Sequence, residues 1–191
     1  FPTRRSSDLK IGSVEIALLA SLGECLVSVY DSPKVAVISF GEELIELGED
    51  LKNGKIFSSN NYAICALLKE YGIESSNIGI IRDDYEFSKK TIEEALSIND
   101  YVVTTGGMSK GDFDYIKNIL KELSAKALFE GVKIKPGKPV SVYGVGKKYI
   151  IGLPGYPNSA YMTFSIFGLP LVLKKIGISH KFPTMKALLK N

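Results

Sequence analysis

The chain has 191 residues, 45% of them apolar and 24% charged, so it can bury the core of one globular domain. The formal net charge is only +3 and the basic residues are scattered, which argues against a nucleic-acid-binding surface. Two distant cysteines and a single histidine exclude a His/Cys metal site and suit a reducing cytoplasm. Charged residues or proline interrupt the longest apolar stretches, so we expect no membrane-spanning helix.

Residues 1–9 show no hydrophobic periodicity, and we expect them to be a non-native leader on a fragment of a longer protein. Next in chain order, residues 14–22 have the pattern of a short helix, and residues 25–30 that of an extended segment. We therefore expect residues 10–32 to be the remnant of a preceding domain and its linker.

The rest of the chain alternates apolar strand patterns with amphipathic helical patterns. Continuous apolar character, typical of strands covered on both faces, predicts strands at residues 34–40, 78–81 and 101–104. A polar loop is expected at 41–59, and helices at 61–71 (with Asn60 as the cap), 87–96 and 113–123. The remaining predicted elements are strands at 127–134, 140–143 and 149–153, and a helix from Pro157 that is broken at Pro170.

Strands separated by helices of this length imply βαβ units. The predicted fold is therefore of the α/β class, a three-layer αβα sandwich with a mainly parallel central sheet, and it spans residues 33–178. In such a sheet the carboxyl ends of the parallel strands line the ligand crevice. Three predicted strands end there in polar or glycine-rich loops, which begin at Gly41, Arg82 and Gly106.

The glycine-rich segment 104–115 (TTGGMSKGDFDY) joins a predicted strand to a predicted helix. Its backbone N–H groups and the positive end of the helix could receive an anion such as phosphate. The candidate cradle consists of Gly106, Gly107, Ser109 and Gly111. Asp114 could hold a cation beside that anion. Alternatively, Asp112 caps the helix and Asp114 only complements its dipole.

Charged groups flank two other predicted strands. Glu43 follows the first core strand, where it could share Mg²⁺ with Asp114, and a solvated acidic turn is the alternative. Lys135 and Lys138 lie in a Pro- and Gly-containing turn that would present two ammonium groups to a phosphate-bearing ligand. An ordinary β-turn with exposed lysines would have the same composition.

A second candidate anion site is the turn that contains Pro154 and Gly155 and leads into a helix at Ser159. The alternative is a stiff turn with a capped helix start. Taken together, the groups predict an electropositive crevice that also contains carboxylates.

In their order and spacing these motifs resemble the molybdopterin molybdotransferase family, over roughly residues 18–189. They are LLASLG at 18–23, GEEL at 41–44, the segment 68–84 with GIIRDD at 79–84, the Gly106 loop, IKPGKP at 134–139 and GLPG at 152–155. The resemblance implies an αβα catalytic domain, which agrees with the fold predicted from the strand and helix patterns.

The resemblance implies a reaction in which adenylylated molybdopterin and molybdate give molybdenum cofactor and AMP, with Mg²⁺. Asp114 and Glu43 would then be the catalytic carboxylates that hold the metal and oxyanion, and Lys135 and Lys138 would bind pterin phosphates or the adenylate. The other substrate-binding residues would be Gly106, Gly107, Ser109, Gly111, Pro154, Gly155 and Ser159. The resemblance also implies a homodimer, and a C-terminal β-domain that begins within residues 179–191.

The sequence departs from the family pattern at several positions. Phe40 stands where the family usually has Thr, Ser58 replaces Asp, and Tyr156 replaces Asn. The carboxylate lost at Ser58 keeps open a non-catalytic molybdopterin-binding or scaffold module. Another alternative is a competence-damage-type nucleotide pyrophosphatase. That class typically continues its Gly-Gly loop with Gly-Pro-Thr, whereas this loop continues with Ser-Lys-Gly-Asp after Met108.

Overall fold

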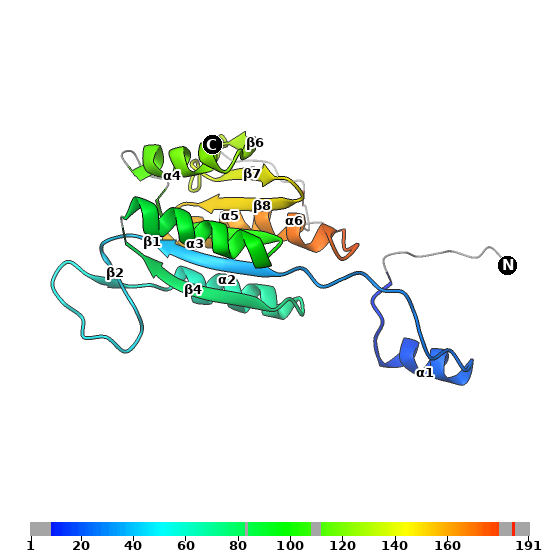
Figure 1. Cartoon of the computed structure of the whole chain (residues 1–191). Coiled ribbons are helices and arrows are strands. Elements are labelled where there is room, and N and C mark those ends of the chain that lie inside the picture. The colour runs from blue at the N-terminus through cyan, green and yellow to red at the C-terminus, as the bar shows by residue number, and fades with distance from the viewer. Residues whose placement is uncertain (1–8, 83, 108–111, 180–184, 186–191) are drawn as a thin grey trace.

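The computed structural model describes residues 9–82, 84–107, 112–179 and 185, with the backbone alone at 112–115. Its centre is a six-stranded sheet in the order β4-β1-β5-β8-β7-β6 (Figure 1). The strands are β1 Val35–Phe40, β4 Ser75–Ile81, β5 Tyr101–Thr105, β6 Lys126–Glu130, β7 Ser141–Val145 and β8 Lys148–Leu153. Strands β4, β1, β5 and β8 pair in parallel, and β7 runs antiparallel to both its neighbours. The mainly parallel sheet is confirmed.

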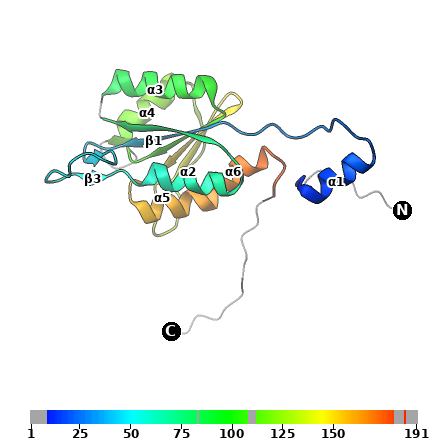
Figure 2. The same cartoon turned by 90° about the horizontal axis from the view of Figure 1, so that it is seen from below.

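Helices cover both faces of this sheet and complete three layers (Figures 1 and 2). Helices α3 and α4 pack on one face, and α2 with the continuous run α5–η1–α6 packs on the other. The helices are α2 Asn60–Glu70, α3 Tyr85–Ile98, α4 Asp112–Glu122, α5 Pro157–Thr163, η1 Phe164–Gly168 and α6 Leu169–Lys174. The αβα sandwich is confirmed.

Strand β1 shows why the sheet is covered on both faces. Val35 and Val37 enter the core under α2, while Ala36 and Ile38 enter the core under α3 and α4. Successive side chains of a strand point to opposite faces, so a continuous apolar run feeds two cores at once. All six residues of β1 are buried as a result.

The loop after β1 and the strand β6 differ from the expectation based on sequence. The predicted polar loop 41–59 contains a short parallel pair, β2 Leu44–Ile45 and β3 Ile56–Phe57. This pair forms because backbone N–H groups of the returning chain donate to carbonyls near β2, Ile56 to Glu43 at 2.9 Å. The predicted strand 127–134 stops at Glu130, because Gly131 has φ +71 and turns the chain out of the ladder.

The predicted break at Pro170 was wrong. The helical run continues to Lys174 through the π-helical turn η1, in which the Leu169 N–H donates to the Phe164 carbonyl. Pro170 lies in the first turn of α6, where its missing N–H and fixed φ are tolerated. Gly168 makes room for the buried Phe164 ring, since a Cβ there would lie 2.4 Å from it.

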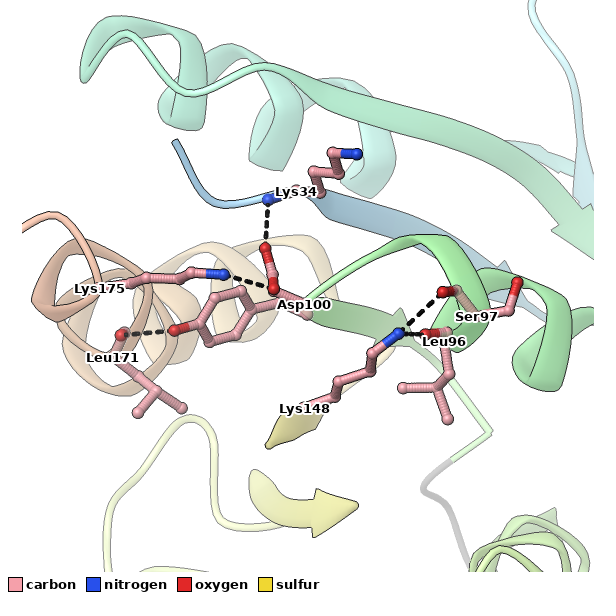
Figure 3. A network of polar contacts seen from close by, with 8 residues as sticks. Lys34, Leu96, Ser97, Asp100, Lys148, Leu171 and Lys175 are labelled. Atoms are coloured by element: carbon pink, nitrogen blue, oxygen red, sulfur yellow. Dashed lines mark hydrogen bonds and ion pairs between the residues drawn. The ribbon is translucent and has the colours of Figure 1, made fainter. Parts of the chain in front are cut away.

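The amino edge of the sheet is joined by polar contacts (Figure 3). The Asp100 carboxylate accepts a hydrogen bond from the Lys34 backbone N–H at 2.9 Å and forms an ion pair with Lys175. Burial raises the pKa of Asp100, but these cationic and N–H partners outweigh it and hold the pKa below its ordinary value. Lys148 donates to the carbonyls of Leu96 and Ser97 at the end of α3. These contacts tie β1, β5, β8, α3 and α6 together.

Helix α1 Ser13–Ser21 lies away from the sheet, as Figures 1 and 2 both show. None of its residues is buried, and several large apolar side chains along 9–30 are exposed. Tyr30 lies against Gly177, where a Cβ would come within 2.6 Å of the tyrosine ring. Across the described residues, none of the helices combines the length and apolar character required to span a membrane.

Candidate functional site at the carboxyl edge of the sheet

The parallel strands β4, β1, β5 and β8 all end at one edge of the sheet. The loops that begin at Arg82, Gly41, Gly106 and Pro154 therefore start side by side, in that order across the sheet. Strand β7 runs the opposite way and pairs its first residue, Ser141, with Gly152 near the end of β8. The segment before Ser141 thus enters from the same edge and brings the Lys135–Lys138 turn to it.

Gly106 and Gly107 turn the chain immediately after β5, with φ +76 and φ +65. A Cβ on Gly106 would lie 2.2 Å from the Phe40 carbonyl oxygen, so the loop backbone presses directly against the end of β1. A Cβ on Gly107 would lie 3.3 Å from both Phe40 and Ile116. The Phe40 side chain, 3% exposed, fills the space beneath the loop. Ser109 and Gly111 lie outside the described residues.

The turn after β8 lies against this glycine loop. A Cβ on Gly155 would be 3.5 Å from the Gly106 Cα, and the Gly106 N–H donates to the Leu153 carbonyl at 3.2 Å. The Asn60 side-chain amide donates to the Gly155 carbonyl at 2.8 Å. Two segments that were predicted separately to bind anions are therefore neighbours. Ser159, also predicted to bind substrate, is 7% exposed within α5.

Asn60 does not act as the helix cap that the sequence predicted. Helix α2 begins at Asn60, and Ser59 occupies the N-cap position without a side-chain hydrogen bond to the helix. The Asn60 amide reaches the Gly155 turn instead, because the end of β8 lies close to the start of α2. The predicted end of this helix is confirmed at Gly72, which has φ +74.

Beneath the edge lies a buried polar network that sequence reasoning missed. Asn61, 0% exposed, accepts hydrogen bonds at its carbonyl oxygen from Ser39 and, at 3.1 Å, from Ser58. The Ser39 hydroxyl also lies 2.8 Å from the Thr105 hydroxyl, and the Asn61 amide donates to Asn77 at 2.8 Å. Buried polar groups are stable when they are hydrogen-bonded in this way. The sequence feature that could have indicated this network is the presence of polar residues within otherwise apolar strands, such as Ser39 in β1 and Thr105 in β5.

Ser58 belongs to this network and explains one departure from the family pattern. Its side chain is 1% exposed, and its hydroxyl donates to Ser39 at 3.3 Å as well as to Asn61. The neutral network satisfies this hydroxyl, whereas a carboxylate at this depth would need a cation or further donors. The chain thus replaces an acidic group with a neutral one at the base of the site.

The turn with Lys135 and Lys138 is fixed by its central residue. Gly137 is buried with φ +109, and a Cβ there would lie 2.3 Å from the Thr163 methyl group of α5. Both lysines are exposed, and neither forms an ion pair with any residue in the described part of the chain. Their ammonium groups are therefore available to an anion at this edge.

The two predicted carboxylates are less fully defined. Glu43 is exposed three residues beyond β1, beside Gly41, and its carboxylate makes no hydrogen bond to another described residue. Asp114 lies in the first turn of α4, and its side chain is outside the described part. Within the described residues there is no group of three or more His, Cys, Asp or Glu side chains that could hold a metal. The predicted meeting of Glu43 with Asp114 therefore stays a prediction.

A polar cavity of about 400 Å³ lies beside this edge, under the loop between β2 and β3. Its charged lining residues are Glu49, Asp50, Lys52, Lys55 and Arg82. No predicted site residue lines it, and its two acidic groups oppose its three cationic ones. The residues predicted to bind the ligand therefore lie outside this cavity, although Arg82, directly after β4, lines it.

The fold is of the α/β class in which ligands generally bind beyond the carboxyl ends of the parallel strands. Residues 36–174 match the model of the family described as "Probable molybdopterin binding domain". The chain belongs to this family.

Comparison with individual proteins agrees with this family assignment. The chain is 40% identical over 175 residues to a molybdopterin molybdenumtransferase of Staphylococcus epidermidis, covering 92% of this chain and 42% of that protein. The crystal structure of a molybdopterin biosynthesis MoeA protein from Pyrococcus horikoshii superposes with a TM-score of 0.77 and 37% identity, covering 88% of this chain and 42% of that one. CinA from Thermoplasma acidophilum shares the fold alone, with a TM-score of 0.56 and 17% identity over 73% of this chain and 98% of that one.

Proposed function

We propose that this chain is the molybdopterin-binding unit of a molybdopterin molybdenumtransferase, in which molybdate is inserted into adenylylated molybdopterin and AMP is released. The observation that carries the proposal is the contact of the Gly106 and Gly155 loops at one edge, which the Lys135–Lys138 turn also enters. The relative that is 40% identical is named a molybdopterin molybdenumtransferase, which supports the transfer of molybdenum to molybdopterin, and this chain spans 42% of its length.

Electrostatics gives these residues their roles. Molybdate and the phosphates of the pterin ligand are all anions, so bringing them together needs fixed positive groups. The Gly107 N–H would contact a phosphate, and Ser109 and Gly111 would extend that cradle. Gly106, whose N–H donates to the Leu153 carbonyl, would shape the turn at which the phosphate binds. Lys135 and Lys138 would bind the phosphates of the pterin or the adenylate. The backbone at Pro154 and Gly155 would close the other side, and the buried Ser159 would belong to the helix start behind it.

Mg²⁺ fits the types of donor present at this edge. It is commonly held by one or two carboxylates together with substrate phosphates, and Glu43 is exposed with no hydrogen-bond partner among the described residues. Glu43 and Asp114 would be the carboxylates that hold the ion. Bound there, it would neutralise charge on the phosphates and the oxyanion.

The test compares Asp114→Ala with Lys138→Ala in a molybdenum-cofactor reconstitution assay, alongside molybdopterin binding and a thermal melt. Asp114→Ala should abolish molybdate insertion and leave molybdopterin affinity within about twofold, because a carboxylate does not attract an anionic pterin. Lys138→Ala should weaken molybdopterin binding about tenfold, since it removes a charged contact to the ground state.

Lys147→Ala is the matched control for Lys138→Ala, because Lys147 is an exposed lysine in the β7–β8 turn at the opposite edge. It should bind molybdopterin as the wild type does. An Asp114→Ala variant that is fully active but has lost about 1 kcal/mol of unfolding free energy would show that Asp114 only stabilises the start of its helix.

The neutral group at Ser58 favours a second candidate, a module that binds molybdopterin without catalysing insertion. The Ser58 hydroxyl is committed to the Ser39–Asn61 network and supplies no acidic group. Such a module would bind molybdopterin with normal affinity and release no AMP from its adenylylated form. AMP release measured in the presence of molybdate therefore separates the two candidates.

We further infer that the reaction takes place in the cytoplasm and that the protein acts as a homodimer. Cys25 and Cys65 are free thiols, which suits a reducing compartment. The exposed apolar side chains along 9–30 offer surface for association. Sedimentation velocity over a hundredfold range of protein concentration tests the dimer.

A further inference from the structure

Two consecutive asparagines at the start of α2 reach in different directions. Asn61 is fully buried and hydrogen-bonds to groups on β1 and β4, namely Ser39 and Asn77. Asn60 is half-buried and donates to the Gly155 carbonyl, in the turn after β8. Through Ser39 the network also reaches Thr105 at the end of β5. One helix end thus contacts or reaches β4, β1, β5 and β8, which are the four parallel strands in their spatial order.

The turn that Asn60 contacts begins just after Leu153, whose carbonyl accepts the hydrogen bond from the Gly106 N–H and holds the end of β8 against the glycine loop. Gly155 and Gly106 meet through backbone atoms alone, because neither has a side chain. The positions from Gly155 to Asn158 are exposed to solvent. Among the described residues, Asn60 provides the side-chain hydrogen bond to the Gly155 carbonyl. Beyond Leu153, Asn60 therefore helps to hold this turn in its position relative to Gly106.

Solvent exposure separates the effect of this bond on stability from its effect on ligand binding. If Asn60 is removed, water can hydrogen-bond the exposed Gly155 carbonyl, so little folding free energy is lost. The exposed part of the turn beyond Leu153 is then held less firmly near Gly106, and a ligand that spans both loops must restore its position on binding. That ordering cost lowers affinity.

We propose that Asn60 is a positioning residue that holds the Gly155 turn against the Gly106 loop and so pre-organises the molybdopterin phosphate site. The inference rests on the proposed function. Asn60 acts through the turn, so its effect should appear in the turn, the glycine loop and ligand affinity before it appears in stability.

The test uses Asn60→Ala, with Asn60→Gln as the conservative variant that keeps the amide donor and Asn118→Ala as control. Asn118 is an exposed asparagine on α4, on the other face of the sheet. The measurements are molybdopterin affinity, melting temperature and the ¹H–¹⁵N signals of Gly106, Gly107 and Gly155.

Asn60→Ala should bind molybdopterin about five- to tenfold more weakly, the range expected for loss of one hydrogen bond, and should melt within about 3 °C of the wild type. The Gly155 and Gly106 signals should shift or broaden. Asn60→Gln should recover part of the affinity, and Asn118→Ala should match the wild type in every measurement.

Wild-type affinity in Asn60→Ala would overturn the proposal, whatever the melting temperature. If the wild-type chain itself bound no molybdopterin, the proposed function would fail and the positioning role would be judged by the spectrum. In that case an unchanged Gly106 signal in Asn60→Ala would overturn it, and a shifted one would support the contact between the loops.

Discussion

Gly106 occupies a position that requires glycine for two separate reasons. Its φ of +76 lies in the left-handed region, and a Cβ would lie 2.2 Å from the Phe40 carbonyl oxygen. The first cost is about 1–2 kcal/mol for a residue with a Cβ. The second is a clash with backbone, which cannot rotate away as a side chain could. The close approach of the glycine loop to β1 therefore depends on a single residue.

Gly106→Ala should lower the free energy of unfolding by about 2–4 kcal/mol and weaken ligand binding at the loop. The control is Gly146→Ala, since Gly146 has φ +61 but an added Cβ would meet nothing within 4 Å. That variant should lose only about 1 kcal/mol. Urea unfolding of both variants isolates the clash, and equal losses would show that Phe40 yields without cost.

At the scale of elements, the two edges of the sheet serve different purposes. The amino edge is closed by contacts such as that of Asp100 with the Lys34 N–H and with Lys175. Tyr101 and Tyr149 stack there at 5.6 Å, and burial, followed by the nearby Tyr149 and Asp100, raises the pKa of Tyr101 to about 12. The carboxyl edge instead carries exposed lysines and glycine turns. The amino edge is therefore closed by side-chain contacts, whereas the carboxyl edge leaves charged side chains exposed.

Asp100→Asn should destabilise the fold by about 1 kcal/mol at pH 7, a modest value because the ion pair is partly exposed to solvent. The folded-state pKa of Asp100 lies below its ordinary value of 3.8, so its contribution is present above pH 3.8 and is lost as pH falls below it. In Asp100→Asn the free energy of unfolding should therefore depend less steeply on pH at acidic pH, the acid limb of the curve, than in the wild type.

Asp31→Asn, in the exposed segment before β1, serves as the control for this change and should leave the acid limb unaltered. Urea midpoints measured between pH 2.5 and pH 7 compare the three proteins. An Asp100→Asn variant that retains the wild-type acid dependence would show that the Lys175 pair contributes nothing to it.

At the scale of the whole molecule, the domain and the segment before it are energetically separate. Helix α1 buries none of its residues, whereas the strands and helices from β1 to α6 form two contiguous cores. Tyr30 lies against Gly177, and this contact links the segment to the domain. Hydrophobic stabilisation scales with buried area, so α1 contributes little to folding.

Removal of residues 1–23 should therefore leave the free energy of unfolding of the domain unchanged within about 0.5 kcal/mol. Tyr30 is retained in this variant, which keeps its contact with Gly177. Chemical denaturation at several protein concentrations measures the effect. A loss above about 1 kcal/mol that shrinks on dilution would show that α1 stabilises an oligomer instead, because dilution removes the oligomer's contribution from the full chain.

Local patterns were sufficient for much of the fold. Continuous apolar runs such as 35–40 predicted strands buried on both faces, because a covered strand needs apolar side chains on each side. Gly72 and Gly106 marked chain reversals, since their left-handed backbone is costly for other residues. The α/β class, the parallel sheet and the edge that carries the glycine loop were all predictable for this reason.

Tertiary structure decided how distant segments meet. Asn60 bonds to Gly155, 95 positions away, and Ser39 bonds to Thr105, 66 positions away. Neither contact leaves a periodic trace in the sequence, because each depends on the strand order β4-β1-β5-β8. Likewise, Pro170 does not end the helical run. It lies in the first turn of α6, which follows directly on the π-helical turn η1. The sequence by itself determined most of the elements and the chemistry of their loops, because both are local, and the packing of the sheet decided which loops meet at one edge.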